Sequence, residues 1–131
     1  MSRTRVSWAV LALASGLAGS QAASCSKPQN SCPAASPALW IAYDEHEPPA
    51  HRVMLRTTIL RDGSVSWAGR IISDDQLATY LMRSRRMDPA PYHVVSYEKG
   101  VACSRIGRLR GMFEQHAACG RQRPCSERMG E

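Results

Sequence analysis

The sequence predicts one small domain of mixed strands and helices, preceded by an export segment and a proline-rich arm. Three observations lead to this expectation: an alternating stretch that runs into an Asp-Gly turn, a capped stretch with helical spacing, and a short apolar N-terminus behind a basic tip. A length of 131 residues suits one compact domain and is too short for two ordinary ones. With 44% hydrophobic and 21% charged residues, the chain has enough apolar surface to fold.

The domain is expected to begin with a β-hairpin. Side chains alternate with a period of two over residues 53–60, which is the signature of a strand. Asp62 and Gly63 then supply a turn, because an Asp-Gly pair favours positive φ at both central positions of a tight hairpin. A second strand returns over residues 65–68, and Gly69 is expected to end it.

A capped helix, a third strand and a second helix are expected after the hairpin. Ser73 and Gln76 have the spacing of a capping box, which starts a helix. Prolines end that helix, a strand is expected over residues 92–97, and the second helix over about residues 102–118. The tail after Gly120 shows no clear strand. The residues expected on the buried faces of the two helices are Leu77, Tyr80, Leu81 and Ser84, and then Ile106, Leu109, Phe113 and either His116 or Ala117.

Residues 1–24 have the composition of a secretory signal. A basic tip with Arg3 and Arg5 precedes an apolar run over residues 6–18, and small residues lead to Cys25. The apolar run is shorter than the about 20 residues that a membrane span needs. We therefore expect cleavage and export, with an uncleaved signal anchor as the alternative. The expected location is the periplasm or the envelope membrane of a bacterial-type cell.

Residues 25–50 are expected to form a linker or an extended arm, because five prolines in this stretch resist helix formation. Residues 39–43 are apolar, and they are expected to form a short strand or to dock on the domain. His46 lies among three carboxylates, yet consecutive residues of a loop cannot all converge on one metal ion. This acidic stretch is therefore expected to be a solvated loop.

The five cysteines are an odd number for an exported protein, in which thiols normally pair. Cys25 follows small residues in the manner of a degenerate lipoprotein cleavage site, and its acylation would leave an even set of four. The alternative is a soluble protein with one spare thiol. The disulfide candidates are Cys32, Cys103, Cys119 and Cys125, and pairing Cys32 with Cys103 and Cys119 with Cys125 is favoured, although the spacing does not determine the connectivity.

No common catalytic or nucleotide-binding signature occurs in the chain, so we expect a non-enzymatic protein without a cofactor. Cys103 with His93 or His116 is the nearest approach to a nucleophile and base, and His116, Cys119 and Cys125 resemble part of a metal site. Because exported thiols are normally oxidised, no catalytic or metal-binding residue is expected. The alternative function is a small exported thiol- or metal-dependent protein.

The net charge is +6 for the whole chain and +4 without residues 1–24. This excess is mild and dispersed, except at Arg83, Arg85 and Arg86 and over residues 105–110. Exported basic proteins often meet anionic partners such as phospholipid headgroups or cell-wall polymers. Solvated arginines on two helix faces are the simpler explanation, and we favour it. Nucleic acid is not an expected partner, because no aromatic-interleaved basic surface accompanies the charge.

From Arg52 to about Gly120 the chain resembles the periplasmic domain of the ExbD/TolR biopolymer-transport proteins. The resemblance covers a little over half of the chain and depends on the succession of the pieces more than on any one of them. The matching pieces are an aliphatic strand into Arg61, Asp62 and Gly63, the segment from Val65 to Gly69 ahead of Ser73, the helix with Leu77 and Leu81, the segment from Pro91 to Val95, and a helix with Ile106 and Met112.

This resemblance implies an α+β fold in which a small sheet is covered on one face by two helices, often as a homodimer. It places the ExbD/TolR-like domain over residues 51–120 and leaves residues 121–131 as a cysteine-containing tail. In that family a transmembrane helix carries an aspartate that takes part in proton-driven transport, whereas residues 1–24 contain no carboxylate. The family's final strand has no clear match either.

The expected function is therefore that of a non-enzymatic envelope protein related to biopolymer transport. Its expected partner is an envelope protein or peptidoglycan, and it is expected to lack proton coupling of its own. Contact with the membrane is expected only through an N-terminal anchor or a lipid.

Overall fold

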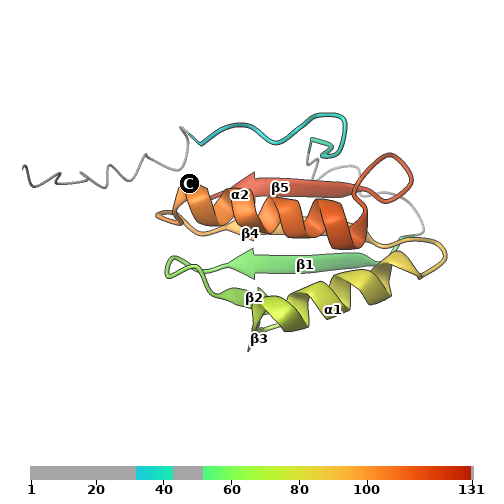
Figure 1. Cartoon of the computed structure of the whole chain (residues 1–131), viewed down its shortest axis with the longest axis horizontal. Coiled ribbons are helices and arrows are strands. Elements are labelled where there is room, and N and C mark those ends of the chain that lie inside the picture. The colour runs from blue at the N-terminus through green and yellow to red at the C-terminus, as the bar shows by residue number, and fades with distance from the viewer. Residues whose placement is uncertain (1–31, 43–51, 131) are drawn as a thin grey trace, which may run out of the picture.

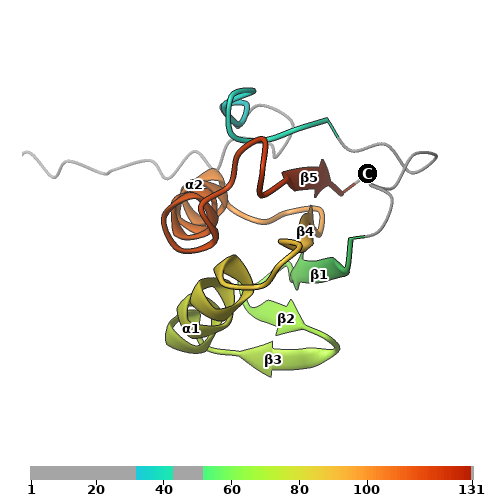
Figure 2. The same cartoon turned by 90° about the vertical axis from the view of Figure 1, so that its right-hand side faces the viewer.

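The computed structural model describes residues 32–42 and 52–130 of the chain. Within these residues a five-stranded mixed sheet carries two helices on one face (Figures 1 and 2). The small α+β fold expected from the sequence is confirmed. The elements are β1 (Met54–Ile59), β2 (Val65–Trp67), β3 (Arg70–Ile72), α1 (Asp74–Arg85), β4 (Tyr92–Tyr97), α2 (Cys103–Met112), the π-helical turn η2 (Phe113–Ala117) and β5 (Cys125–Met129).

The strands lie in the order β3-β2-β1-β4-β5. β1, β4 and β5 are parallel to one another. β2 is antiparallel to β1, and β3 is antiparallel to β2, so β3 runs in the same direction as β1. We call the end of the sheet where β1, β4 and β5 start the amino end, and we call the end where they finish the carboxyl end. α1 runs from the carboxyl to the amino end between β3 and β4, and α2 connects β4 to β5 in the same direction. Residues 1–24, for which export was expected, Cys25 and the acidic stretch at residues 44–47 lie outside the described residues.

The turn between β1 and β2 is not the tight Asp-Gly turn that the sequence suggests. Gly63 alone has a positive φ, of 85°, and its N–H donates to the carbonyl of Leu60 at 2.8 Å. Asp62 keeps an ordinary φ, and its carboxylate accepts a hydrogen bond from the N–H of Ser64 at 2.9 Å. The loop is therefore a three-residue hairpin connection in which only the last position needs glycine.

The tight two-residue turn lies instead at Ala68 and Gly69, whose φ angles are 48° and 78°. Trp67 and Arg70 flank this turn and pair with each other. The second strand ends before Gly69, as expected, but the chain reverses there and returns as β3, a strand that the sequence analysis did not predict. The signal for this turn is weak in the sequence, since alanine seldom adopts a positive φ.

The expectation of a tail without a strand is also wrong. β5 pairs in parallel with β4 along its whole length, so the folded domain extends through the tail. Two of the β5 positions that face the helices are Cys125, which is in a disulfide, and Glu127, which is paired with Arg110 of α2. Because those inward positions are not aliphatic, the hydrophobic alternation that reveals a strand is missing from the sequence.

The predicted capping box starts α1. The Ser73 hydroxyl accepts a hydrogen bond from the N–H of Gln76 at 3.1 Å, and the Gln76 side chain accepts one from the N–H of Ser73 at 2.9 Å. Leu77, Leu81 and Ser84 are buried on the expected face. The local prediction for this helix is therefore confirmed.

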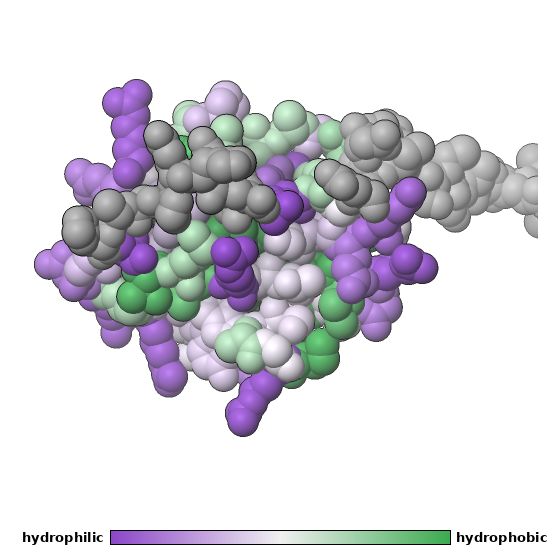
Figure 3. All heavy atoms as spheres, turned by 180° about the vertical axis from the view of Figure 1, so that it is seen from behind, coloured by the Kyte–Doolittle hydropathy of each residue, from purple (hydrophilic) through white to green (hydrophobic). Residues whose placement is uncertain are grey.

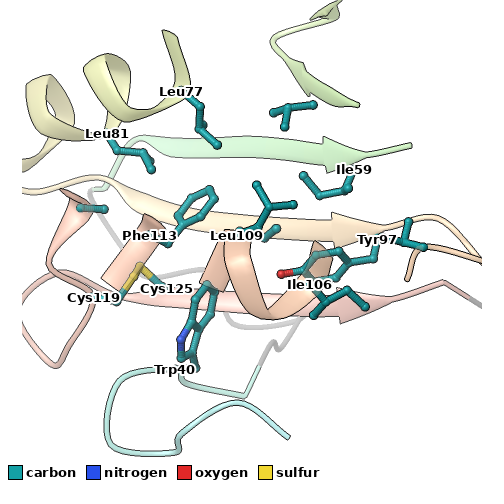
Figure 4. Packing of buried hydrophobic residues seen from close by; sticks show 14 residues of the cluster. Trp40, Ile59, Leu77, Leu81, Tyr97, Ile106, Leu109, Phe113, Cys119 and Cys125 are labelled. Carbon is teal, nitrogen blue, oxygen red and sulfur yellow. A yellow bond between two sulfur atoms is a disulfide. The ribbon is translucent and has the colours of Figure 1, made fainter. Parts of the chain in front are cut away.

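Figure 4 shows the core between the sheet and the helices, where Phe113 of η2 lies between the leucines of α1 and Trp40 of the arm. The ring centroids of Trp40 and Phe113 are 6.0 Å apart, and Trp40 is only 5% exposed. Full burial of one large apolar side chain contributes about 1.5–3 kcal/mol to stability. Trp40 and Phe113 are thus central to the core.

The described part of the proline-rich arm is docked along α2 and β5. A disulfide joins Cys32 to Cys103, and the indole N–H of Trp40 donates to the Glu114 carboxylate at 2.8 Å. The N–H of Ile41 donates to the carbonyl of Cys125 at 2.9 Å, which covers part of the outer edge of β5. The docking expected for the apolar residues near position 40 is therefore observed.

The face of the sheet away from the helices carries a row of hydroxyl side chains. Ser66, Thr58 and Ser96 occupy paired positions on β2, β1 and β4. The middle of this face is accordingly pale in Figure 3, between purple and green side chains. Among the described helices, none is long and apolar enough to span a membrane.

Candidate partner-binding edge and neighbouring pockets

The four described cysteines form two disulfides, Cys32–Cys103 and Cys119–Cys125, which are the two pairs favoured from the sequence. Cys103 therefore has no thiol, and the nucleophile considered with His93 or His116 is contradicted. Cys119 and Cys125 are likewise oxidised and cannot bind a metal as thiolates. Among the described residues, no group of three or more His, Cys, Asp or Glu side chains could hold a metal ion.

At the carboxyl end, an ion pair connects the first turns of the two helices. Arg105 in the first turn of α2 donates two hydrogen bonds of 2.7 Å to Asp74, the first residue of α1, and one of 2.9 Å to the carbonyl of Gly63. Hydrogen bonding to Arg105 holds the pKa of the Asp74 carboxyl below its usual range. Because its donors are engaged within the protein, Arg105 acts as a structural contact.

His93 and Ser84 form a buried pair near the amino end. The Ser84 hydroxyl lies 2.9 Å from His93 Nε2 and donates its single proton to the carbonyl of Leu81 at 2.8 Å. His93 Nε2 therefore carries the hydrogen that the Ser84 oxygen accepts. A serine nucleophile would instead have to donate its proton to the histidine. The Ser84–His93 hydrogen bond is therefore a structural contact between α1 and β4.

Burial lowers the pKa of His93 to about 4, so the imidazole is neutral at physiological pH. Its Nδ1 has no hydrogen-bond partner among the described residues. The ring lies 5.6 Å from Phe113 in an edge-on contact and 6.3 Å from Trp67, centroid to centroid. His93 is thus a polar member of an aromatic cluster. Its protonation would place a charge among buried rings, which is energetically unfavourable.

An apolar pocket of about 290 Å³ lies beside this cluster, where α1 faces β1 and β2. Trp67 and Tyr80 form one side of it, with ring centroids 5.6 Å apart. Its lining residues are Leu55, Trp67, Tyr80, Arg83, Ser84 and Met87. Sequence analysis placed Tyr80 on the buried face of α1, but it had no means of placing Leu55 or Met87 beside it.

β3 forms the open edge of the sheet, and within the described residues it pairs with β2 alone. Trp67 and Arg70 flank the tight turn and exchange hydrogen bonds, so the next pair, Ser66 with Ile71, does not. The N–H and C=O of Ile71 therefore point away from β2, and its side chain is 60% exposed. The sequence signal that was missed is the Ala68-Gly69 turn followed by two isoleucines.

A search of protein-family models and of curated proteins finds no match to this chain.

Proposed function

We propose that this chain is a non-enzymatic, exported envelope module that binds a protein partner by strand addition at β3. An edge strand presents unpaired backbone groups, which an extended segment of a partner can continue as a further strand. The outward N–H and C=O of Ile71, beside an exposed apolar side chain, are the observation that carries the proposal.

The asymmetry between the two edges of the sheet supports this choice of surface. The opposite edge, at β5, is partly covered by the docked arm through the hydrogen bond from Ile41 to Cys125. Natural proteins often cover edge strands that should not pair, as the arm does here at β5. β3 has only three residues, which limits pairing to a short partner segment.

The resemblance to ExbD/TolR periplasmic domains also supports an envelope role. The order of hairpin, helix, strand and helix is present, and β5 follows the second helix, where the sequence analysis found no strand. Two disulfides suit an oxidising compartment such as the periplasm. Because residues 1–24 contain no carboxylate, we propose a relative of the transport proteins that lacks proton coupling of its own.

The alternative thiol-dependent function receives less support from the cysteines. Both described pairs are oxidised, so a free thiol would have to come from Cys25, which lies outside the described residues. A metal-dependent function would likewise need ligands from outside the described part of the chain.

Photo-crosslinking in the cell envelope tests the proposal. Arg70 is replaced by a photo-crosslinking amino acid in the full chain, and the adducts are identified by mass spectrometry with Ile71 kept, changed to Val or changed to Pro. Ile71→Pro removes the outward N–H of residue 71 without removing a hydrogen bond between β2 and β3. Ile71→Val retains that N–H. We expect one defined protein adduct, either an envelope protein or a second copy of this chain, that persists with Ile71→Val and is lost with Ile71→Pro.

A thermal melt of each variant separates loss of binding from loss of folding, and the three proteins should melt within a few degrees of one another. A protein adduct that Ile71→Pro leaves unchanged would show that strand addition is wrong. Adducts to peptidoglycan fragments alone would indicate that the partner is the cell wall and not a protein.

A further inference from the structure

A pocket of about 390 Å³ at the amino end of the sheet is lined by four arginines from three segments of the chain. Arg52 precedes β1, Arg85 and Arg86 end α1, and Arg123 precedes β5. Its volume lies in the range of small-ligand pockets. Residues this distant in the sequence meet here only because the parallel strands all start at this end.

These four arginines have no carboxylate partner within the described residues, where the ion pairs are those of Arg105 and Arg108 with Asp74 and of Arg110 with Glu127. Asp88, which is exposed, is the one carboxylate in the pocket lining. Like charges gathered around one pocket repel one another. A bound anion would relieve that repulsion.

The helix dipole accounts for only part of this cluster. Cations are favourable near the last turn of a helix, which explains Arg85 and Arg86. Arg52 is instead held over the pocket by hydrogen bonds from one guanidinium nitrogen to the carbonyls of Ala90 and Gln122, at 2.8 and 3.0 Å. Arg123 has a buried Nε without a hydrogen-bond partner among the described residues.

The arginine pocket adjoins the apolar pocket beside Trp67 and Tyr80, because Met87 lines both of them. Met87 is 44% exposed, so a ligand bound across the two pockets would cover part of its apolar surface. A cationic pocket next to an apolar one matches a ligand with an anionic group at the end of an apolar chain.

We propose that the arginine pocket binds the phosphate group of an anionic amphiphile, with the apolar chain of the ligand lying in the pocket of Trp67, Tyr80 and Leu55. Guanidinium groups bind phosphate oxygens through paired, charge-assisted hydrogen bonds, and phosphate has enough oxygens to engage several of them. Binding of the ligand chain in the apolar pocket would increase the affinity, because it removes the chain and Met87 from water. This site is separate from the β3 edge, so either proposal can fail without the other.

Isothermal titration of the full chain with decyl phosphate, below its micelle concentration, and with methyl phosphate tests the two halves of the site. We expect decyl phosphate to bind at least about tenfold more tightly than methyl phosphate, because only decyl phosphate reaches the apolar pocket. The double variant Arg85→Gln/Arg86→Gln should weaken decyl phosphate binding by at least about tenfold. Met87→Ser should reduce the advantage of decyl phosphate over methyl phosphate.

A charge-matched control removes two arginines elsewhere. Arg56→Gln/Arg108→Gln lowers the net charge by the same amount and touches neither pocket. We expect this control to bind decyl phosphate like the unmodified chain. Equal losses in both double variants would assign the binding to bulk charge and overturn the proposal. Equal affinity for decyl and methyl phosphate, or no binding of either, would overturn it as well.

Discussion

The two ends of the sheet use arginine in opposite ways. At the carboxyl end, Arg105 is engaged by Asp74 and by the carbonyl of Gly63, and it joins both helix starts to the first hairpin. At the amino end, Arg85 and Arg86 line a pocket and have no carboxylate partner in the described part of the chain.

This difference shows that the basic residues of the chain do not form one class. Removal of a paired, partly buried arginine leaves its carboxylate without a partner and destabilises the fold. An unpaired arginine beside a pocket contributes mainly to the local electrostatic potential. The net charge in the sequence cannot separate the two kinds. Four predictions, ordered from the largest effect on stability to the smallest, test whether the carboxyl end is built for stability and the amino end for binding.

Each end of the sheet has one disulfide. The difference between the contributions of the two disulfides to stability should be the largest of the four effects. Cys32–Cys103 at the carboxyl end spans 71 residues, and Cys119–Cys125 at the amino end spans 6. Loop-closure entropy predicts that replacing both cysteines by alanine lowers the free energy of unfolding by about 4 kcal/mol for the first pair and about 2 kcal/mol for the second. Urea unfolding without reductant measures both. A larger loss from the Cys119–Cys125 pair would reverse the proposed roles of the two ends.

The two ends should also lose stability in different pH ranges. The pKa of His93 near the amino end is about 4 in the folded chain against 6.5 for an ordinary histidine. The unfolded chain therefore binds the extra proton between these values, so stability is complete above about pH 6.5 and falls by about 3 kcal/mol as the pH drops toward 4.

His93→Gln should flatten that slope between pH 6.5 and 4 in urea unfolding experiments. The carboxyl end responds at lower pH, because the pKa of Asp74 is lowered below 3.8 and its contribution is lost only as that carboxylate is protonated. An unchanged slope in the His93 variant would mean that another group controls acid stability.

Removing arginines should destabilise the carboxyl end and spare the amino end. Arg105→Gln leaves Asp74 half-buried without its bidentate partner, so we expect a loss of about 1–2 kcal/mol. Arg86→Gln should change the free energy of unfolding by less than about 0.5 kcal/mol, since that side chain is exposed. Thermal melts at neutral pH compare the two variants. Similar losses would contradict the contrast between the ends.

The two hairpin turns offer the finest comparison. Gly63→Val at the carboxyl end should cost more than about 1 kcal/mol, because a β-branched residue is strained at a φ of 85°. Ala68→Gly at the amino end should stabilise the chain by about 0.5 kcal/mol, because alanine is already strained at a φ of 48°. Melting temperatures measure both changes. An unchanged melting temperature for the valine variant would show that the turn tolerates the strain.

Sequence analysis succeeded where a signal is local. The capping box of Ser73 and Gln76 and the buried positions of both helices depend on spacings of three or four residues, which tertiary contacts left unchanged. It failed at β5, where the inward Glu127 and Cys125 are satisfied by partners from other elements. It also missed β3, which depends on a strained alanine at position 68.

The candidate sites show the same division. The basic segment from Arg83 to Arg86 was identified from the sequence, but its meeting with Arg52 and Arg123 depends on parallel strands that start side by side. The open edge at Ile71 likewise exists only because the order of the strands places β3 outermost.

The sequence by itself determined the order of the principal helices and strands, the start of α1 and the apolar residues that the helices bury. Tertiary structure alone decided that the arm packs Trp40 into the core, that β5 completes the sheet and which arginines find carboxylates. The physical reason is distance along the chain. Capping and periodicity act within one or two helical turns, whereas a pair such as Trp40 with Glu114 forms only when segments 74 residues apart meet in the folded domain.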